Sequence, residues 1–397
     1  MSGSKRVRVL IVDDSAIARD LLERGLSLDP DIEVVGKAAD AYVARDKIVF
    51  LKPDVVTLDV EMPRMDGIAF LRKLMPQYPI PVVVVSAVTA EGSRRALEAL
   101  EAGALDVVAK PSAKDHAGLK TMIAELSERV KEAARADPEK LRVVLAESAG
   151  TATPKVEAAV DDQSAVDEPT VGTQARPKVT PARPKAAPVL KSLKSGGAPG
   201  PITKKVIAIG ASTGGTIALG KVVTALPADS PPVVIVQHMP PVFTKMFAES
   251  MNRQAKVTVK EAEDGDALIR GRVLVAPGDR HMRLRKTAGG YIVGLSDGDK
   301  VSGHRPSVDV LFNSVAEVVG NEAVAAILTG MGRDGADGML ALRRAGARCV
   351  AQDEATSVVF GMPREAWDNG AAEVLVPIDR MAYELMTRAG GSLMRGS

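Results

Sequence analysis

Three aspartates follow two apolar runs near the start of the chain. Asp13 and Asp14 come directly after Val7–Val12, and Asp59 comes directly after Val55–Leu58. If both runs are parallel strands of one sheet, the three carboxylates meet at its C-terminal edge. Like charges so placed need a cation, and a ligand set made only of oxygen suits Mg²⁺. The pattern therefore predicts a magnesium site at that edge.

A hydroxyl and an ammonium group end the next two apolar runs. Ser86 follows Val82–Val85, and Lys110 ends the run that begins at Asp106. A metal and a lysine together offset the charge of a phosphoryl group, so Asp59 is the expected phosphoryl acceptor. Any α/β protein gathers some polar residues where its strands end, but four such strand ends in order are much more specific.

A serine in the second half of the chain lies between glycines. The segment Gly210-Ala211-Ser212-Thr213-Gly214 follows an apolar run and matches G-x-S-x-G. Such a tight turn can expose a serine nucleophile and bring N–H groups of the next helix close to a developing oxyanion. The same glycines could cradle a phosphate, or form a turn that has only a structural role. The motif alone leaves all three interpretations open.

Two later residues could complete a hydrolytic site. His238 directly follows an apolar run, where a general base belongs, and Asp334 follows another in a glycine-rich turn. Asp337 is a nearby rival for the carboxylate, and Asp334 could instead be a helix cap. His281 and His304 lie in segments typical of loops and could bind substrate. The order serine, histidine, aspartate differs from that of α/β-hydrolases, so the serine motif does not imply that fold.

These residues must be positioned by an alternation of strands and helices that occurs in both halves of the chain. Five βα units predict a doubly wound parallel sheet over residues 1–136, and a second mainly parallel α/β domain is expected over 204–390. The expected strands are Val7–Val12, Glu33–Gly36, Val55–Leu58, Val82–Val85 and Asp106–Val108, then Val206–Ile209, Val233–Gln237, Val273–Ala276, Val324–Leu328 and Cys349–Gln352.

Residues 137–203 differ in composition from both flanking parts. They are rich in alanine, proline, serine and charge, acidic first and basic later, and the tetrapeptide ARPK occurs twice. Few large apolar side chains are present to build a core, so we expect a flexible linker. A charged linker of this kind is usually a solvated spacer, and the alternative is a docking strip for an acidic partner.

The bulk composition excludes several classes of protein. The 397 residues are 46% apolar and 26% charged, and 52 basic residues nearly balance 50 acidic ones, so nucleic acid is not an expected partner. The single cysteine, Cys349, cannot form an internal disulfide, and the start MSGSKRVRVL lacks the apolar stretch of a secretory signal. No apolar run approaches the length that spans a bilayer. We expect a cytoplasmic protein without membrane insertion.

The first third of the chain resembles response-regulator receiver domains. The strings VDD at Val12, LDVEMPRMDG at Leu58, VSA at Val85 and KP at Lys110 carry the resemblance. It implies a flavodoxin-like fold in which two acidic side chains before the phosphorylated one bind Mg²⁺ and a histidine kinase is the phosphodonor. The implied roles are metal binding for Asp13, Asp14 and Asp59, phosphorylation of Asp59, sensing of the phosphoryl group by Ser86 and contact with it by Lys110.

One position departs from that resemblance. Many receivers carry an aromatic residue, which serves as a rotameric switch, three positions before the lysine, whereas this chain has Val107. The departure leaves open how phosphorylation at Asp59 would be relayed to the rest of the chain.

The second domain resembles the chemotaxis protein-glutamate methylesterases and glutamine deamidases. IGASTGG, QHMP, GHRPSVD and LTGMGRDG, downstream of a receiver, carry this resemblance. It implies a Rossmann-like three-layer fold, and hydrolysis of glutamyl methyl esters and selected glutamines on the cytoplasmic domains of chemoreceptors, without a cofactor at the hydrolase site. Ser212 would attack, His238 would transfer the proton and Asp334 would orient the imidazole, while Thr213 and the Met331 backbone would belong to the oxyanion site.

Two other functions compete with this interpretation. The second domain could be a ligand sensor with GASTGG as a phosphate loop, although no Walker lysine follows the glycines. A transcription factor would need a basic recognition helix, and none is evident in the sequence. The domain order suggests a further hypothesis: the unphosphorylated receiver covers the Ser212 cleft, and phosphorylation of Asp59 weakens that packing.

Overall fold

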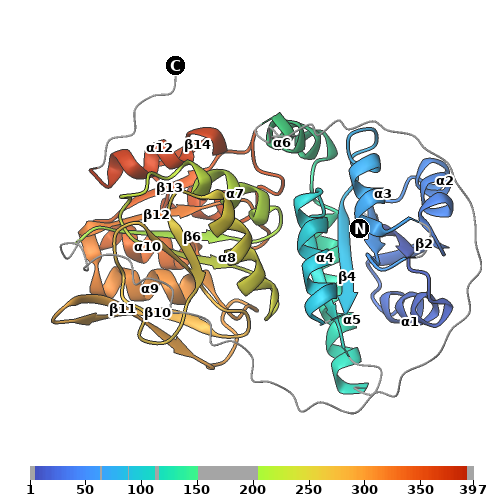
Figure 1. The fold of residues 1–397 in the computed structure, drawn as a ribbon, viewed down its shortest axis with the longest axis horizontal. Coiled ribbons are helices and arrows are strands. Elements are labelled where there is room, and N and C mark those ends of the chain that lie inside the picture. Colours follow the sequence, from blue (N-terminus) through green and yellow to red (C-terminus); the bar gives the residue numbers. More distant parts are fainter. Residues whose placement is uncertain (1–4, 63–64, 88, 112–115, 151–203, 391–397) are drawn as a thin grey trace, which may run out of the picture.

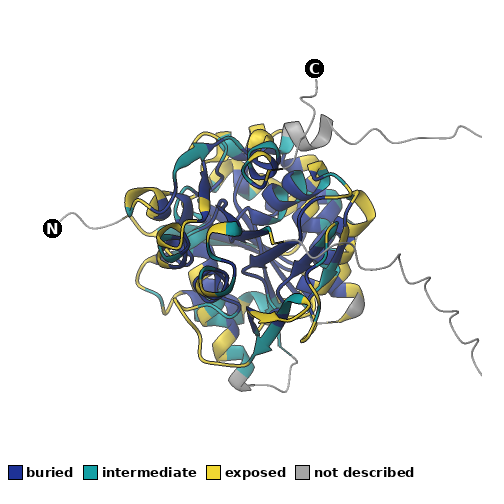
Figure 2. Cartoon of the chain, turned by 90° about the vertical axis from the view of Figure 1, so that its left-hand side faces the viewer, coloured by how far each residue is buried: buried dark blue, intermediate teal, exposed yellow. Residues whose placement is uncertain are grey.

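The computed structural model describes residues 5–62, 65–87, 89–111, 116–150 and 204–390 of the chain. Figure 1 shows two α/β units side by side, each built on a parallel sheet with helices on both faces. In Figure 2 the strands run through the buried interior and the exposed residues lie on the outer helices and loops. The two expected α/β sheets are confirmed.

The first sheet has the strand order β2-β1-β3-β4-β5, with every pair parallel. This is the flavodoxin-like order, and the C-terminal ends of β1 and β3 are neighbours. Its strands are nearly continuous runs of valine, leucine and isoleucine because both faces are covered by helices. The elements are β1 (Val7–Val12), α1 (Ala16–Leu26), β2 (Ile32–Ala38), α2 (Ala41–Leu51), β3 (Val55–Leu58), α3 (Gly67–Leu74), β4 (Val82–Ala87), α4 (Ala90–Glu101), β5 (Asp106–Lys110) and α5 (His116–Ala133).

The second sheet has the order β14-β13-β12-β6-β7-β9-β8, and all its pairs are parallel. The chain leaves β6 on one side toward β7 and later returns to β12 on the other side, so a topological switch point lies beside the end of β6. The strands are β6 (Val206–Ala211), β7 (Val233–Gln237), β8 (Thr258–Glu261), β9 (Arg272–Val275), β12 (Ala323–Ile327), β13 (Arg348–Gln352) and β14 (Val374–Val376).

Helices cover this sheet, and an antiparallel hairpin of β10 and β11 stands outside it. The hairpin and the strands β8 and β14 were not predicted from the sequence. These remaining elements are α7 (Gly215–Ala225), α8 (Phe243–Gln254), β10 (His281–Thr287), β11 (Gly290–Ser296), α9 (Val308–Val318), the short 3-10 helix η1 (Gly320–Glu322), α10 (Ala336–Arg344), α11 (Met362–Asp368) and α12 (Ile378–Arg388).

The start of the predicted linker is a helix. Residues 138–150 form α6 (Pro138–Gly150), which packs through the buried Leu141 and Val144. Its Lys140 Nζ donates to the Glu354 carbonyl at 2.7 Å. The prediction of a flexible linker was therefore wrong for these residues, because two apolar side chains suffice to hold a helix between two domains. Residues 151–203 lie outside the described part of the chain. Among the described residues, no helix is both long and apolar enough to cross a membrane.

Candidate functional site

Ser212 lies in the turn between β6 and α7, at the switch point of the second sheet. Its backbone N–H donates to the Thr329 carbonyl at 3.0 Å, and its carbonyl accepts from Gly215 at 2.7 Å. Gly214 has φ of 77°, and a Cβ at Gly210 would lie 2.3 Å from a methyl group of Val308, so two glycines are required for this tight turn. Ser212 is buried, and among the described residues its hydroxyl has no hydrogen-bond partner.

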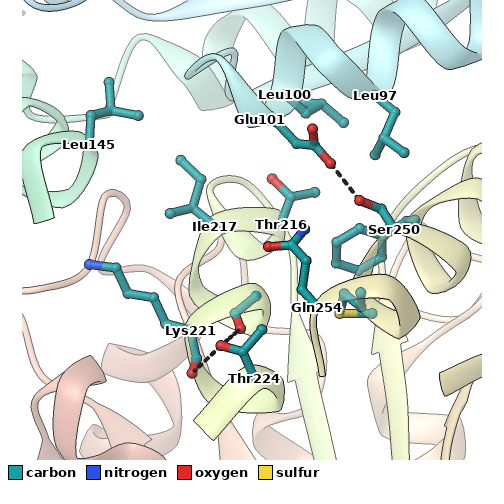
Figure 3. Close-up of a pocket in the computed structure, with 13 residues that line it drawn as sticks. Leu97, Leu100, Glu101, Leu145, Thr216, Ile217, Lys221, Thr224, Ser250 and Gln254 are labelled. Atoms are coloured by element: carbon teal, nitrogen blue, oxygen red, sulfur yellow. Dashed lines mark hydrogen bonds between the residues drawn. The ribbon is translucent and has the colours of Figure 1, made fainter. Parts of the chain in front are cut away.

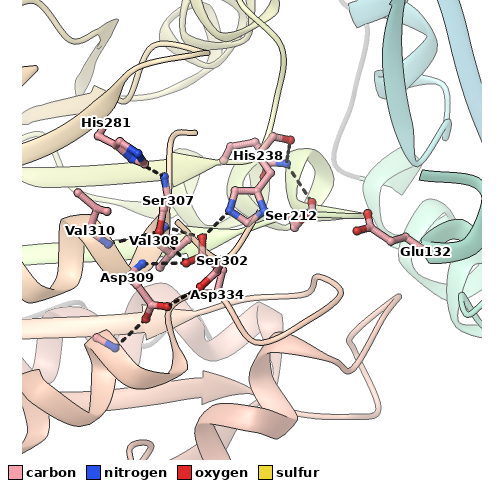
Figure 4. A network of polar contacts seen from close by, with 12 residues as sticks. Glu132, Ser212, His238, His281, Ser302, Ser307, Val308, Asp309, Val310 and Asp334 are labelled. Atoms are coloured by element: carbon pink, nitrogen blue, oxygen red, sulfur yellow. Dashed lines mark hydrogen bonds and ion pairs between the residues drawn. The ribbon is translucent and has the colours of Figure 1, made fainter. Parts of the chain in front are cut away.

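His238 and Asp334 meet beside this serine (Figure 4). The His238 Nε2 lies 2.8 Å from Oδ2 of Asp334, and both side chains are buried. Within the described residues, Nδ1 has no partner. Figure 4 shows this second ring nitrogen on the side of Ser212. Three strand ends thus bring together the three residues that the sequence predicted.

The Asp334 carboxylate sits at the N-terminus of α9. It accepts from the Ser307 hydroxyl at 2.7 Å, the Val308 N–H at 2.7 Å and the Asp309 N–H at 3.1 Å. All three of these partners are donors, and the helix terminus presents its positive end to the same oxygens. The proton between Asp334 and His238 therefore resides on Nε2, which leaves the lone pair of Nδ1 for the serine.

His238 is poised as a neutral base. Burial, with a smaller contribution from the Arg129 guanidinium, lowers the pKa of His238 to about 3. Gln237 fixes the backbone on both sides, because its Nε2 donates to the Ser212 carbonyl at 2.9 Å and to the His238 carbonyl at 3.3 Å. Such a set can activate a hydroxyl and return its proton to a leaving group.

The other candidate residues of the second domain occupy distinct places. Asp337, the rival carboxylate, pairs with Arg333 at the surface at 2.8 Å. His281 has a structural position, since Nε2 lies 2.8 Å from the Asp299 carbonyl and Nδ1 accepts from the Ser307 N–H at 3.3 Å. The His304 ring is stacked on the ring of His238.

Thr213 and Met331 flank Ser212 and also meet the receiver. The Thr213 hydroxyl donates to Glu132 of α5 at 3.3 Å, and the Met331 Sδ lies 3.2 Å from Nη1 of Arg135. The Gly214 N–H, at the start of α7, points to the Leu105 carbonyl at 3.5 Å. The receiver thus lies over the turn that carries Ser212.

Sequence reasoning missed four contributors to this site. Ser307 and Gln237 were not singled out, His304 was assigned only a possible contact with substrate, and Glu132 lies in the other domain. Ser307 alone had a usable signal, because a serine directly before an apolar helical run is a typical N-cap.

A charged cluster in α5 and β5 backs the contact with Thr213. Arg129 lies 3.3 Å from Asp106 and 3.2 Å from Glu132, and all three side chains are largely buried. Burial raises the pKa of Asp106 to about 6, against the opposing effect of Arg129. A further contact joins Ser250 of α8 to Glu101 of α4 at 2.5 Å.

A cavity of about 330 Å³ separates α4 from α7 and α8 next to this last contact (Figure 3). Leu97, Leu100, Ile217 and Phe247 supply much of its apolar wall. The two domains therefore meet at a partly unfilled interface that combines these polar contacts with apolar side chains from both sides.

The three aspartates of the receiver converge as predicted. Asp13, Asp14 and Asp59 each offer a carboxylate oxygen, all within 4.8 Å of one another. The Lys110 ammonium lies 2.8 Å from Asp13 and 2.6 Å from Asp59. Burial raises the pKa of Asp59, and Lys110 opposes this shift. An oxygen-only donor set with excess negative charge fits a hard divalent cation.

Two further receiver residues were assigned roles by resemblance. The Ser86 hydroxyl is buried and donates to the Gly92 carbonyl of α4 at 3.0 Å, so it links the end of β4 to that helix. Val107 is fully buried within β5. A buried valine cannot swing between an exposed and a buried rotamer as a larger aromatic side chain could.

Comparisons with known proteins agree with both halves. Residues 207–385 match the model of the CheB methylesterase family, and residues 9–123 match the response regulator receiver domain. A protein-glutamate methylesterase/protein-glutamine glutaminase of Syntrophotalea carbinolica is 50% identical over 96% of this chain and 97% of its own length. Another of the same name from Pseudomonas aeruginosa is 45% identical, with the same shares covered.

A solved structure adds a further similarity. The CheB methylesterase catalytic domain of Thermotoga maritima is 39% identical, covering 46% of this chain and 98% of that domain with a TM-score of 0.46. The near-full-length relatives decide the assignment. The chain is a member of the protein-glutamate methylesterase/protein-glutamine glutaminase family that carries a receiver domain.

Proposed function

We propose that this chain hydrolyses methyl esters of glutamate side chains on chemoreceptors, and deamidates selected glutamines, by a serine mechanism under control of its receiver. The observation that carries the mechanism is the buried set of Ser212, His238 and Asp334, in which a neutral imidazole is hydrogen-bonded to the carboxyl group. The relatives' names supply the two reactions.

In this proposal each residue performs one step. The Ser212 Oγ attacks the side-chain carbonyl while Nδ1 of His238 takes the hydroxyl proton, and Asp334 balances the imidazolium. The carbon–oxygen bond of the ester breaks, and the imidazolium protonates the leaving methoxide to give methanol. Water then attacks the acyl-serine by the same route and releases glutamate. An amide substrate releases ammonia instead.

The oxyanion of the tetrahedral intermediate needs preorganised donors. Backbone N–H groups of Thr213 and Met331 are our proposed donors, because both residues adjoin the nucleophile in turns after β6 and β12. The N-terminus of α7 points its positive end at the same place.

The receiver would be phosphorylated at Asp59 by a histidine kinase. Asp13, Asp14 and Asp59 would hold Mg²⁺, which neutralises phosphoryl charge when bound. The Lys110 ammonium would contact the phosphoryl group, since it already lies on two of these carboxylates. Ser86 would sense the group through the end of β4.

We propose that the unphosphorylated receiver restrains the enzyme. While Glu132 contacts Thr213, Ser212 and His238 are each only 2% exposed. A glutamyl side chain of a substrate protein cannot reach them in this arrangement. The working boundaries are residues 1–136 for the receiver and 204–390 for the catalytic domain, with α6 bridging them. Action on cytoplasmic receptor domains would place the chain in the cytoplasm.

The test is methanol release from methylated chemoreceptor membranes, with and without a small-molecule phosphodonor and Mg²⁺. Ser212→Ala should abolish release, whereas Ser230→Ala should retain it, because among the described residues the buried Ser230 hydroxyl hydrogen-bonds only to the neighbouring Pro231 carbonyl. Release that survives in Ser212→Ala refutes the serine mechanism. Absence of release from folded wild-type protein under all conditions refutes the esterase assignment for that receptor and favours the phosphate-loop interpretation.

A further inference from the structure

The His304 ring lies flat on the ring of His238. The two centroids are 3.7 Å apart, and the planes differ by 8°. No motif places a second imidazole there, because His304 comes from the loop between β11 and α9 and is 66 positions from its partner. A contact this close and parallel covers one face of the proposed base.

The loop that carries His304 is held by the catalytic domain itself. Backbone N–H groups of Val301 and His304 donate to each other's carbonyls at 3.1 and 2.9 Å. Arg305 contacts Asp279 at 2.6 Å and donates to the Gly298 carbonyl at 2.8 Å. None of these contacts involves the receiver, so the stacked pair is expected to persist when the receiver leaves.

The in-plane contacts of His238 leave its tilt undetermined. The hydrogen bond from Nε2 to Asp334 fixes one edge of the ring, and Nδ1 faces the serine without a partner among the described residues. A ring anchored at one nitrogen can still rock about that bond. A flat neighbour on its face removes this freedom and excludes water from the same side.

The stack also suits the charge that develops on His238. When the serine proton moves to Nδ1, the ring becomes an imidazolium, and the face of a neutral aromatic ring attracts a cation. Burial first, and then His238 and Arg129, lower the pKa of His304 to about 2, with Asp334 opposing and Lys300 adding to the shift. With the receiver in place, His304 is thus neutral near pH 7.

We propose that His304 is a positioning residue that holds the general base of this esterase in plane and stabilises its imidazolium form through the ring face. The proposal rests on the serine mechanism proposed above. It requires a flat neutral ring at position 304 and makes no use of the His304 nitrogens. The proposal therefore predicts that an aromatic replacement of His304 retains activity, whereas an aliphatic or amide replacement loses it.

The test compares His304→Phe, His304→Ala and His304→Gln in the full chain, activated with phosphodonor and Mg²⁺. We expect kcat for methanol release to fall about ten-fold in His304→Ala and His304→Gln, with KM unchanged, and to stay within about three-fold of wild type in His304→Phe. Val301→Ala is the matched loop control and should leave both kcat and KM unchanged.

Thermal unfolding identifies variants that have lost the fold. If His304→Ala is one of them, the comparison rests on His304→Gln and His304→Phe. Wild-type kcat in folded His304→Ala and His304→Gln overturns the proposal. Equal losses in Phe and Gln also overturn it, because they would assign the role to an imidazole nitrogen. Failure of the serine mechanism shows separately, as activity in Ser212→Ala.

Discussion

Replacing Asp334 with asparagine tests the polarity of the site, because four donors bind this carboxylate and the Asp309 carboxyl lies beside it. Oδ2 accepts from Nε2 of His238 and from Val308 N–H, and Oδ1 accepts from Ser307 and from Asp309 N–H. Asparagine offers one acceptor oxygen and one NH₂ group in the same shape. Whichever way the amide is turned, its NH₂ faces a backbone N–H.

Two orientations are possible, and each damages the site. With NH₂ toward His238, Nε2 must accept, so the ring proton moves to Nδ1 and the base can no longer take the serine proton. With NH₂ toward Asp309, the tautomer survives but the imidazolium loses its counter-charge. The first case resembles a triad with the wrong tautomer, for which a loss of about 10⁴-fold in kcat is typical. One unpaired buried N–H costs about 1–3 kcal/mol of unfolding free energy.

The assays are methanol release by the activated chain and urea unfolding of the same preparations. We expect kcat to fall by at least about 10³-fold, which corresponds to about 4 kcal/mol, with unfolding free energy lowered by less than that. Asp337→Asn is the matched control, since its carboxylate binds Arg333 at the surface. A kcat for Asp334→Asn within a few-fold of wild type would refute the assignment of Asp334.

Three further predictions concern the receiver and pH. Glu132→Ala removes the bond to the Thr213 hydroxyl and should raise methanol release by the unphosphorylated chain several-fold; unchanged basal release would count against this contact as a restraint. Asp59→Asn should abolish stimulation by phosphodonor while basal release persists, and stimulation that survives would place the phosphoryl group elsewhere. The pKa of His238 is lowered to about 3 by burial and by Arg129, so the covered base stays neutral in acid. Once the receiver leaves, this pKa should rise toward 6.5, and the activated chain should lose kcat/KM below about pH 6.5 while residual activity of the unphosphorylated chain continues to lower pH; superimposable acid limbs would contradict this. The stability of the fold depends on pH with the same sign. Because the fold keeps His238 neutral, the free energy of unfolding decreases as pH falls below the pKa that His238 has in the unfolded chain.

The residues at strand ends were predictable because parallel strands deliver their C-terminal ends to one edge. Ser212, His238 and Asp334 follow β6, β7 and β12, and each strand is a long enough apolar run to be recognised. The strand β8 was missed because its sequence TVKE is short and charged, as suits an edge strand. In β10 the buried Met282 and Leu284 alternate with the exposed Arg283 and Arg285, but this alternation is short and β11 does not repeat it.

Contacts between distant segments were beyond reach of the sequence pattern. The stack of His304 on His238 and the bond of Glu132 to Thr213 join elements far apart in the chain. Periodicity predicts which face of an element is buried but not which element covers it. The helix α6 was missed for the same reason, because Leu141 and Val144 stabilise it only when they are buried against the rest of the protein.

Strand β5 has Lys110 at one end, while Leu105, just before its other end, touches the catalytic domain. About 16 Å of extended backbone separates Lys110, at the sheet edge that carries Asp59, from the Leu105 carbonyl, which faces Gly214. An extended chain paired to β4 behaves as a stiff rod, so a pull on the lysine moves both ends together. The bond at Gly214 is already 3.5 Å long, and a shift of about 1 Å would break it. The signal can therefore travel as a displacement of main chain, for which the side chain at Val107 need not turn.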